Sequence, residues 1–143
     1  MLYNYILDLQ APKDASLKPL EIDSRLITTN LLSQGSPNNW TTSNVTIIGI
    51  IDGGQINTNK LKNLSNLTYQ DTKTLFKTRY DFYLFFENKT TSPVTIGQVT
   101  GVGKSGVNST NLNDLIKPSK IYQTTRLVVY NNQIIRMVLY IWQ

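Results

Sequence analysis

The C-terminal end of the chain constrains the fold more than any other segment. Two largely apolar segments, Ile121–Tyr130 and Gln133–Trp142, flank the pair Asn131-Asn132. Because asparagine tolerates the positive φ angles of a type I′ turn, this arrangement predicts a β-hairpin with a two-residue turn.

In that hairpin Tyr130 pairs with Gln133, and the side chains of the last strand divide between two faces. One face carries Ile135, Met137, Leu139 and Ile141, and the other carries Ile134, Val138, Tyr140 and Trp142. A strand that is apolar on both faces is typical of the centre of a sheet. We therefore expect it to be central and covered by a helix on at least one face.

Three other segments have strand patterns. Residues 80–87 alternate, with Tyr80, Phe82, Leu84 and Phe86 on one face and Asp81, Tyr83, Phe85 and Glu87 on the other. Residues 45–51 are rich in β-branched side chains and apolar on both faces, which predicts a buried strand. A further strand is expected around residues 94–99, and the glycine-rich segment 100–118 is expected to be a long loop.

An amphipathic helix is predicted to begin near Pro19, since proline suits the first turn of a helix. Its apolar stripe is Leu20, Ile27 and Leu31, with Leu26 beside it. We expect the helix to end near Gln34, with Gly35 as its C-terminal cap and Pro37 preventing continuation. Further along, Asn57 or Thr58 can cap a short helix, and another helical turn is expected around residues 71–77.

These elements predict an α+β fold: a mainly antiparallel sheet with a C-terminal β-hairpin, covered by an N-terminal helix and one or two short helices. The length of 143 residues suits one compact domain, so residues 1–143 are expected to form a single soluble domain. Residues 2–9 fit a strand or a helix, and both alternatives stay open. The longest apolar runs, residues 45–51 and 134–142, are shorter than the about 20 residues that cross a bilayer.

The composition excludes several classes of chemistry. The chain has neither histidine nor cysteine, so it has no ordinary zinc site, thiol nucleophile, Ser–His relay or disulfide. Its nine carboxylates form no clean pair, because Asp81 and Glu87 would lie about 20 Å apart on one strand, too far for two-carboxylate glycoside chemistry. We therefore expect no enzymatic activity, cofactor or metal.

The segment Gly101-Val102-Gly103-Lys104-Ser105-Gly106 matches G-x-G-x-x-G and the end of a phosphate-binding P-loop. A P-loop needs glycine five residues before Gly103, where this chain has Gln98, and it must open a helix. The residues that follow are a poor helix start. A hairpin-type loop is therefore the favoured interpretation.

A cluster of basic residues is a second candidate site. The net charge is +5, and five cations lie within twenty residues: Lys60, Lys62, Lys73, Lys77 and Arg79. The adjoining aromatic strand lacks the glycine and small residues of an RNA-recognition strand. Nucleic-acid binding therefore stays a minor alternative to a solvated basic face.

N-glycosylation sequons are the strongest indication of the protein's cellular location. Asn, Thr and Ser make up 42 of the 143 residues, and there are only two glutamates. Asn-X-Ser/Thr occurs six times, about twice the number expected from composition, at Asn39, Asn44, Asn63, Asn66, Asn88 and Asn108. Used sequons would lie at the surface of an extracellular protein, while an asparagine-rich composition alone remains the alternative explanation.

The run Gly35-Ser36-Pro37-Asn38-Asn39-Trp40-Thr41 is followed by Ile48-Gly49-Ile50, by Asn57-Thr58-Asn59-Lys60-Leu61, by the aromatic strand at 80–86 and by the ending Leu139-Tyr140-Ile141-Trp142. Together these segments resemble archaeal type IV pilin-like surface proteins. The resemblance implies a class III signal, a hydrophobic N-terminal helix that anchors the subunit in the membrane and forms the filament core, and an outward β-rich head. It gives Gly35, Pro37 and Trp40 a structural role, with Trp40 holding the loop after the helix against the sheet.

The leading hypothesis is therefore a non-enzymatic subunit, pilin-like or minor-pilin, of an archaeal cell-surface filament. Its partners would be other pilin-like subunits, and its location extracellular and membrane-anchored, through a helix that precedes residue 1. The alternative is a soluble extracellular binding module for a ligand, a partner or nucleic acid during uptake. A distant third is an intracellular enzyme that uses Gly101–Gly106.

Overall fold

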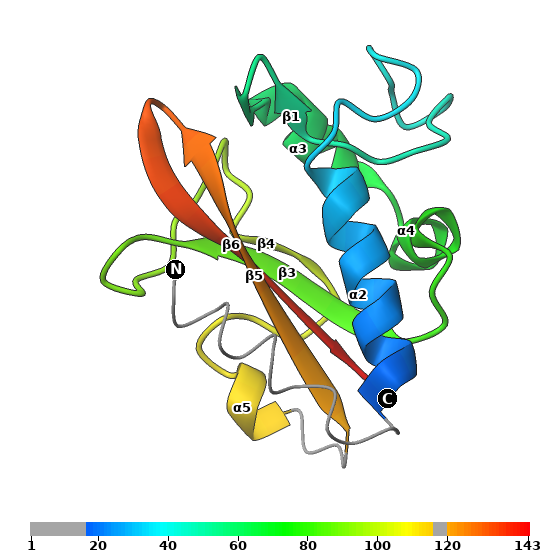
Figure 1. The fold of residues 1–143 in the computed structure, drawn as a ribbon, viewed down its shortest axis with the longest axis vertical. Helices are drawn as coiled ribbons and strands as arrows, with labels where there is room; N and C mark the ends of the chain where they lie inside the picture. The colour runs from blue at the N-terminus through cyan, green and yellow to red at the C-terminus, as the bar shows by residue number, and fades with distance from the viewer. Residues whose placement is uncertain (1–16, 116–119) are drawn as a thin grey trace.

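The computed structural model describes residues 17–115 and 120–143 (Figure 1). The helices are α2 (Lys18–Leu31), α3 (Thr58–Asn66), α4 (Tyr69–Phe76) and α5 (Leu112–Leu115). The strands are β1 (Ile51–Asp52), β2 (Gln55–Ile56), β3 (Asp81–Glu87), β4 (Gly101–Gly103), β5 (Ile121–Tyr130) and β6 (Gln133–Trp142). The predicted α+β class is confirmed, whereas residues 2–9 lie outside the described residues.

The main sheet is antiparallel, in the order β4-β3-β6-β5, and β1 and β2 form a separate two-stranded sheet. The predicted hairpin is confirmed, with Tyr130 opposite Gln133 and positive φ angles of 52° at Asn131 and 63° at Asn132. β6 lies between β3 and β5, so the prediction that the last strand is central is also confirmed.

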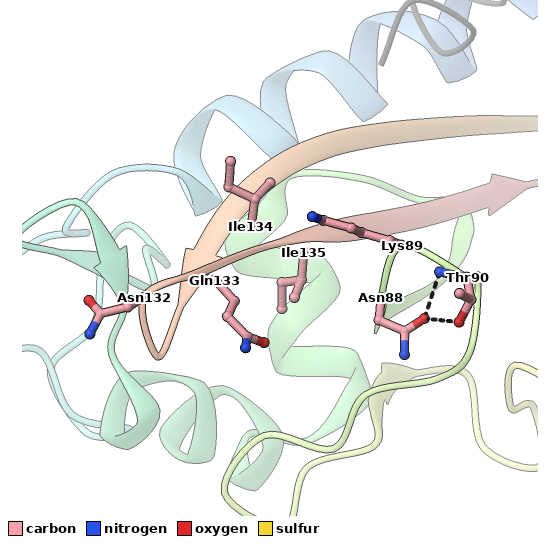
Figure 2. Close-up of a pocket in the computed structure, with 7 residues that line it drawn as sticks. All are labelled: Asn88, Lys89, Thr90, Asn132, Gln133, Ile134 and Ile135. Carbon is pink, nitrogen blue, oxygen red and sulfur yellow. Dashed lines mark hydrogen bonds between the residues drawn. The ribbon is translucent and has the colours of Figure 1, made fainter.

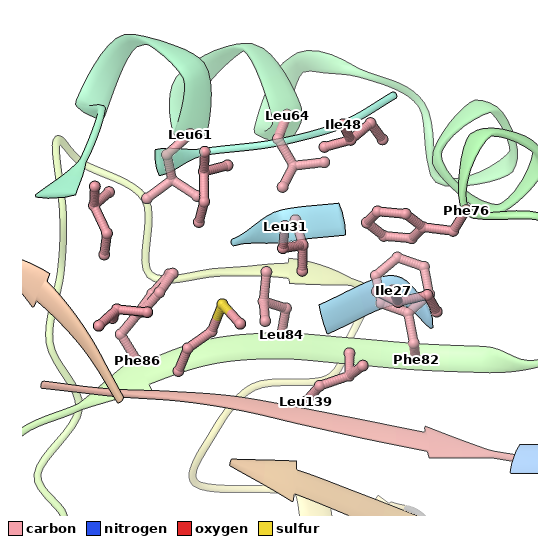
Figure 3. Packing of buried hydrophobic residues seen from close by; sticks show 14 of the residues in the cluster. Ile27, Leu31, Ile48, Leu61, Leu64, Phe76, Phe82, Leu84, Phe86 and Leu139 are labelled. Atoms are coloured by element: carbon pink, nitrogen blue, oxygen red, sulfur yellow. The ribbon is translucent and has the colours of Figure 1, made fainter. Parts of the chain in front are cut away.

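One face of the sheet carries the main hydrophobic core, and α2, α3 and α4 lie on this side (Figures 1 and 3). Figure 3 shows the core side chains Ile27, Leu31, Ile48, Leu61, Leu64, Phe76, Phe82, Leu84, Phe86 and Leu139. The Ser24 hydroxyl of α2 bonds to the Thr124 hydroxyl of β5, so this polar pair is satisfied within the core. The covering helix that the apolar last strand requires is therefore α2.

The opposite face has a smaller apolar cluster of Tyr83, Phe85, Leu112, Val138 and Trp142. The Leu112 side chain comes from α5, so the segment after β4 covers this part of the sheet. Burial raises the pKa of the Tyr83 hydroxyl, since the ionised form would lose its hydration. The two clusters explain why β6 is apolar on both faces.

Hydrogen bonds at the caps explain where the helices begin and end. The Asn57 side chain accepts a hydrogen bond from Lys60 N at 3.1 Å and begins α3, as predicted. α4 begins earlier than expected, because Thr68 caps it by accepting from Asp71 N. The prediction of Gly35 as the cap of α2 is wrong: the cap is Leu32, and Gly35 (φ +81°) turns the chain beyond it.

The strand predicted at 45–51 is also wrong, although Ile48 and Ile50 are buried as expected. Ile47 is 41% exposed, and a single β-bridge joins it to Ser36. Ile50 N donates to Leu31 O and Ile51 N to Ser33 O, so backbone groups in this segment bond to the end of α2 and not to a neighbouring strand. Only its last residue enters a strand, the short β1.

The region after β3 differs from its prediction as well. Residues 96–99 form a tight turn in which Ile96 pairs with Val99, because Gly97 and Gln98 both have positive φ, and Val94 N donates to Phe86 O of β3. The segment 100–118, expected to be a loop, includes β4 and α5 among its described residues. No helix within residues 17–115 and 120–143 is long and apolar enough to cross a membrane.

Candidate functional site

The sequon asparagines lie mostly at exposed positions. Asn39, Asn44, Asn66 and Asn108 are exposed, and Asn63 and Asn88 are half-buried. All except Asn63 and Asn66, which belong to α3, lie outside the helices and strands.

Asn88 and Asn108 share a local geometry. The Asn88 Oδ1 accepts hydrogen bonds from the N and Oγ1 of Thr90, at 2.9 and 2.8 Å (Figure 2). The Asn108 Oδ1 accepts the same two bonds from Thr110, at 2.9 and 2.6 Å. In both turns the carbonyl oxygen faces its own sequon threonine. The amide nitrogen, the atom that would carry a glycan, has no partner within the described residues.

Asn63 differs from the other five because its amide nitrogen donates a hydrogen bond to another described residue. Its Nδ2 donates to Trp40 O at 3.4 Å, which links α3 to the loop after α2. A glycan on Asn63 would replace this bond, so Asn63 is the sequon least suited to modification.

Two of the three motif residues, Gly35 and Trp40, form a packed corner. Trp40 is 2% exposed, and its Nε1 donates to Gly49 O at 2.8 Å. A Cβ on Gly35 would lie 2.7 Å from Trp40 Cδ1 and 2.6 Å from Ile47 O, so only glycine fits there. Pro37 follows a cis peptide bond and is exposed. Trp40 thus anchors the loop through Gly49 and α3.

A surface pocket of about 540 Å³ lies between the turn after β3 and the start of β6 (Figure 2). It is lined by Asn88, Lys89, Thr90, Asn132, Gln133, Ile134 and Ile135. Its chemistry combines amide groups, one cation and an apolar surface. Arg136 of β6 donates to Asn88 O at 3.4 Å and so links the two segments that line the pocket.

The five clustered cations do not form one exposed patch. Lys60 is 5% exposed, donates to Gln34 O at 2.8 Å and lies 3.4 Å from the Asp52 carboxylate. Lys73 is largely buried, whereas Lys62, Lys77 and Arg79 are exposed.

The structure brings together a polar cluster that the sequence pattern did not indicate. The Tyr69 hydroxyl donates to Asp81 Oδ1 at 2.7 Å, and Lys73 and Lys104 lie 3.7 and 3.6 Å from the same oxygen. Burial and the bond to Asp81 raise the pKa of Tyr69, although a hydrogen bond from Phe82 N acts in the opposite direction. These residues come from α4, β3 and the loop after β4, so no local spacing could reveal them.

The glycine motif is part of the sheet edge. Gly101–Gly103 is β4, and Lys104 N donates to Phe82 O, so this N–H is not available to a phosphate. The next described helix, α5, begins only at Leu112. These residues do not form the P-loop geometry of a phosphate site.

Within the described ranges, no three Asp or Glu side chains are grouped closely enough to hold a metal ion. No family model, curated protein or solved structure matches this chain.

Proposed function

We propose that this chain is the exported, non-enzymatic head of a pilin-like or minor-pilin subunit of an archaeal cell-surface filament. The observation that carries the proposal is the placement of the sequons, since four of the six asparagines are exposed. Two more features support it: Asn88 and Asn108 leave their amide nitrogens unbonded within the described chain, and the Trp40 corner has the motif of the resemblance.

The proposal requires glycans on the exposed sequons and a partner surface elsewhere. A filament subunit acts through its contacts with neighbouring subunits, and an N-terminal apolar helix of about 20 residues would anchor it before assembly. The gene should therefore encode a basic signal and such a helix upstream of residue 1.

The test is mass spectrometry of the protein from its native cells, combined with a membrane-impermeant lysine label. We expect glycans that fragmentation of the peptides assigns to Asn39, Asn44, Asn66 and Asn108, and labelling of Lys89 in intact cells. Asn63 is the internal control and should stay unmodified. An unmodified protein that is labelled only after lysis would refute export, and a glycosylated protein that never joins a filament would refute assembly.

The pocket in Figure 2 favours a second candidate, an extracellular binding module. Its amides can bond to hydroxyl groups and its isoleucines can cover an apolar ring face, so a sugar is the ligand class that fits. Titration with simple sugars should shift NMR signals of Gln133 and Ile134, and Gln133→Ala should weaken the effect while Gln123→Ala does not. The absence of shifts at millimolar sugar would exclude this candidate.

A further inference from the structure

The outer edge of β5 is a long strand edge without a paired strand. β5 has ten residues, and among residues 17–115 and 120–143 its only strand partner is β6 (Figure 1). The opposite edge of the sheet, β4, has only three residues. Natural proteins usually shorten, bulge or cover such an edge, because its free N–H and C=O groups pair readily with another strand.

The register shows which backbone groups face outward. Tyr130 and Gln133 flank a two-residue turn, so they form a hydrogen-bonded pair, and every second residue of β5 from Tyr130 bonds to β6. The outward residues are therefore Ile121, Gln123, Thr125, Leu127 and Val129. The pairing runs residue by residue to Ile121 without a bulge or proline, so nothing in β5 itself blocks an added strand.

Cations line the edge on the α2 side. Lys18 and Arg25 have side chains that are 57% and 64% exposed, and both pair with the buried carboxylate of Glu21. The side chain of Arg126 on β5 lines a small hollow with Glu21 and Arg25, and it has no hydrogen bond or ion pair with any described residue. Counting described residues alone, Lys18, Arg25 and Arg126 place three positive charges on this side of the edge, against the one negative charge of Glu21.

Two features on the α2 side of this edge are suited to binding a partner chain. A hollow of about 290 Å³ on α2 is lined by Lys18, Glu21, Ile22, Arg25, Leu26 and Thr29, and it shares Glu21 and Arg25 with the hollow at Arg126. Glu21 Oε1 is buried, and its only described neighbour of opposite charge is Lys18 at 3.3 Å, without a hydrogen bond. Among the described residues Arg126 has no carboxylate partner, which favours an acidic incoming chain, and the buried Glu21 oxygen can accept only from an N–H of that chain.

The other side of the edge has two exposed apolar side chains. Ile121 and Leu127 alternate with the buried residues of β5 and are 37% and 39% exposed. Successive residues of an added strand point to opposite faces of the sheet. One set would meet the cations of α2 and β5, and the other would meet these two apolar side chains.

We propose that the outer edge of β5 binds an extended acidic segment of a partner protein, in which acidic and apolar residues alternate. The segment adds to the sheet as a strand, with its carboxylates toward Arg126 and Arg25 and its apolar side chains toward Ile121 and Leu127. A second copy of this chain does not fit, because pairing two β5 edges would bring the same cations together. The inference does not depend on the filament proposal.

The test is fluorescence anisotropy with the whole chain and a labelled peptide of alternating glutamate and valine, about nine residues long. We expect binding that weakens as salt rises from about 50 to 500 mM, because the cations are partly exposed. Arg126→Gln should weaken binding about tenfold, the loss of one charge-assisted contact. The matched control Lys62→Gln removes an exposed cation of α3 and should change binding less than about twofold.

Two further peptides separate strand addition from charge attraction. N-methylation of the valines blocks antiparallel addition and N-methylation of the glutamates blocks parallel addition, so one of these peptides should lose binding while the other keeps it. In the complex, hydrogen exchange at the outward amides of β5 should slow. Absence of binding at low salt, equal binding of a scrambled peptide, or a β5-paired dimer of the free chain in sedimentation would each overturn the proposal.

Discussion

The close contact between Gly49 and the loop after α2 leads to a specific prediction about the stability of the fold. A Cβ on Gly49 would collide with Gly35 N and Ser33 O and would lie 2.7 Å from Gln34 C. All three are backbone atoms, so no side-chain rotation can relieve the overlap. Gly49→Ala must therefore displace this loop from the end of α2.

The magnitude follows from that geometry. Overpacking a well-packed site costs typically about 1–3 kcal/mol, and the fixed obstructing atoms place Gly49→Ala at about 3 kcal/mol or more. The displacement also strains the bond from Trp40 Nε1 to Gly49 O. For a chain of this length the melting temperature should fall by roughly 10 °C.

The control is Gly54→Ala. Gly54 has φ +80° and nothing within 4 Å of an added Cβ, so the substitution costs only the left-handed conformation, about 1–2 kcal/mol. Urea unfolding followed by far-UV circular dichroism measures both variants. If Gly49→Ala costs no more than Gly54→Ala, the close approach of Gly49 to the loop is not rigid and the reasoning fails.

Three further predictions concern single side chains. Tyr69→Phe removes the hydroxyl bonded to Asp81 and should lower the free energy of unfolding by about 1–3 kcal/mol in urea titrations at neutral pH. The raised pKa of Tyr69 means that the unfolded chain loses this proton first, so wild-type stability should fall as pH rises above about 10, and Tyr69→Phe should reduce that fall. Lys60→Met should cost about 1–3 kcal/mol, because it leaves Gln34 O without its donor, and calorimetry should show a lower melting temperature. Asn132→Gly should raise the free energy of unfolding by less than about 1 kcal/mol, because glycine accepts the positive φ at this turn position, and a loss of stability would contradict the turn type.

Elements with short-range signals were predictable from the residues alone. The Asn131-Asn132 turn set the register of β5 and β6, the alternation at 80–87 predicted β3, and Asn57 marked the start of α3. Each signal depends on neighbours within a few residues, so local geometry decides the outcome.

Elements whose partners are distant were not predictable. Residues 45–51 have the composition of a buried strand, yet the amides of Ile50 and Ile51 bond to Leu31 O and Ser33 O at and just after the end of α2, and only Ile51 pairs with another strand, the short β2. The candidate sites could not be predicted in full for the same reason. The sequence shows where the sequons are, but the bond from the Asn63 amide to Trp40 O and the burial of Lys60 beside Gln34 depend on how distant segments pack.

The pattern of residues was enough to predict the hairpin, the amphipathic helix and the α+β class, and the composition excludes histidine and cysteine chemistry. Tertiary structure alone decided the strand order, and with it the position of β5 at the edge of the sheet. It also brought Arg126 of β5 next to Arg25 of α2, about a hundred residues away in the chain. The reason is physical: capping and periodicity act over a few residues, whereas edges, pockets and charge clusters arise when distant segments pack together.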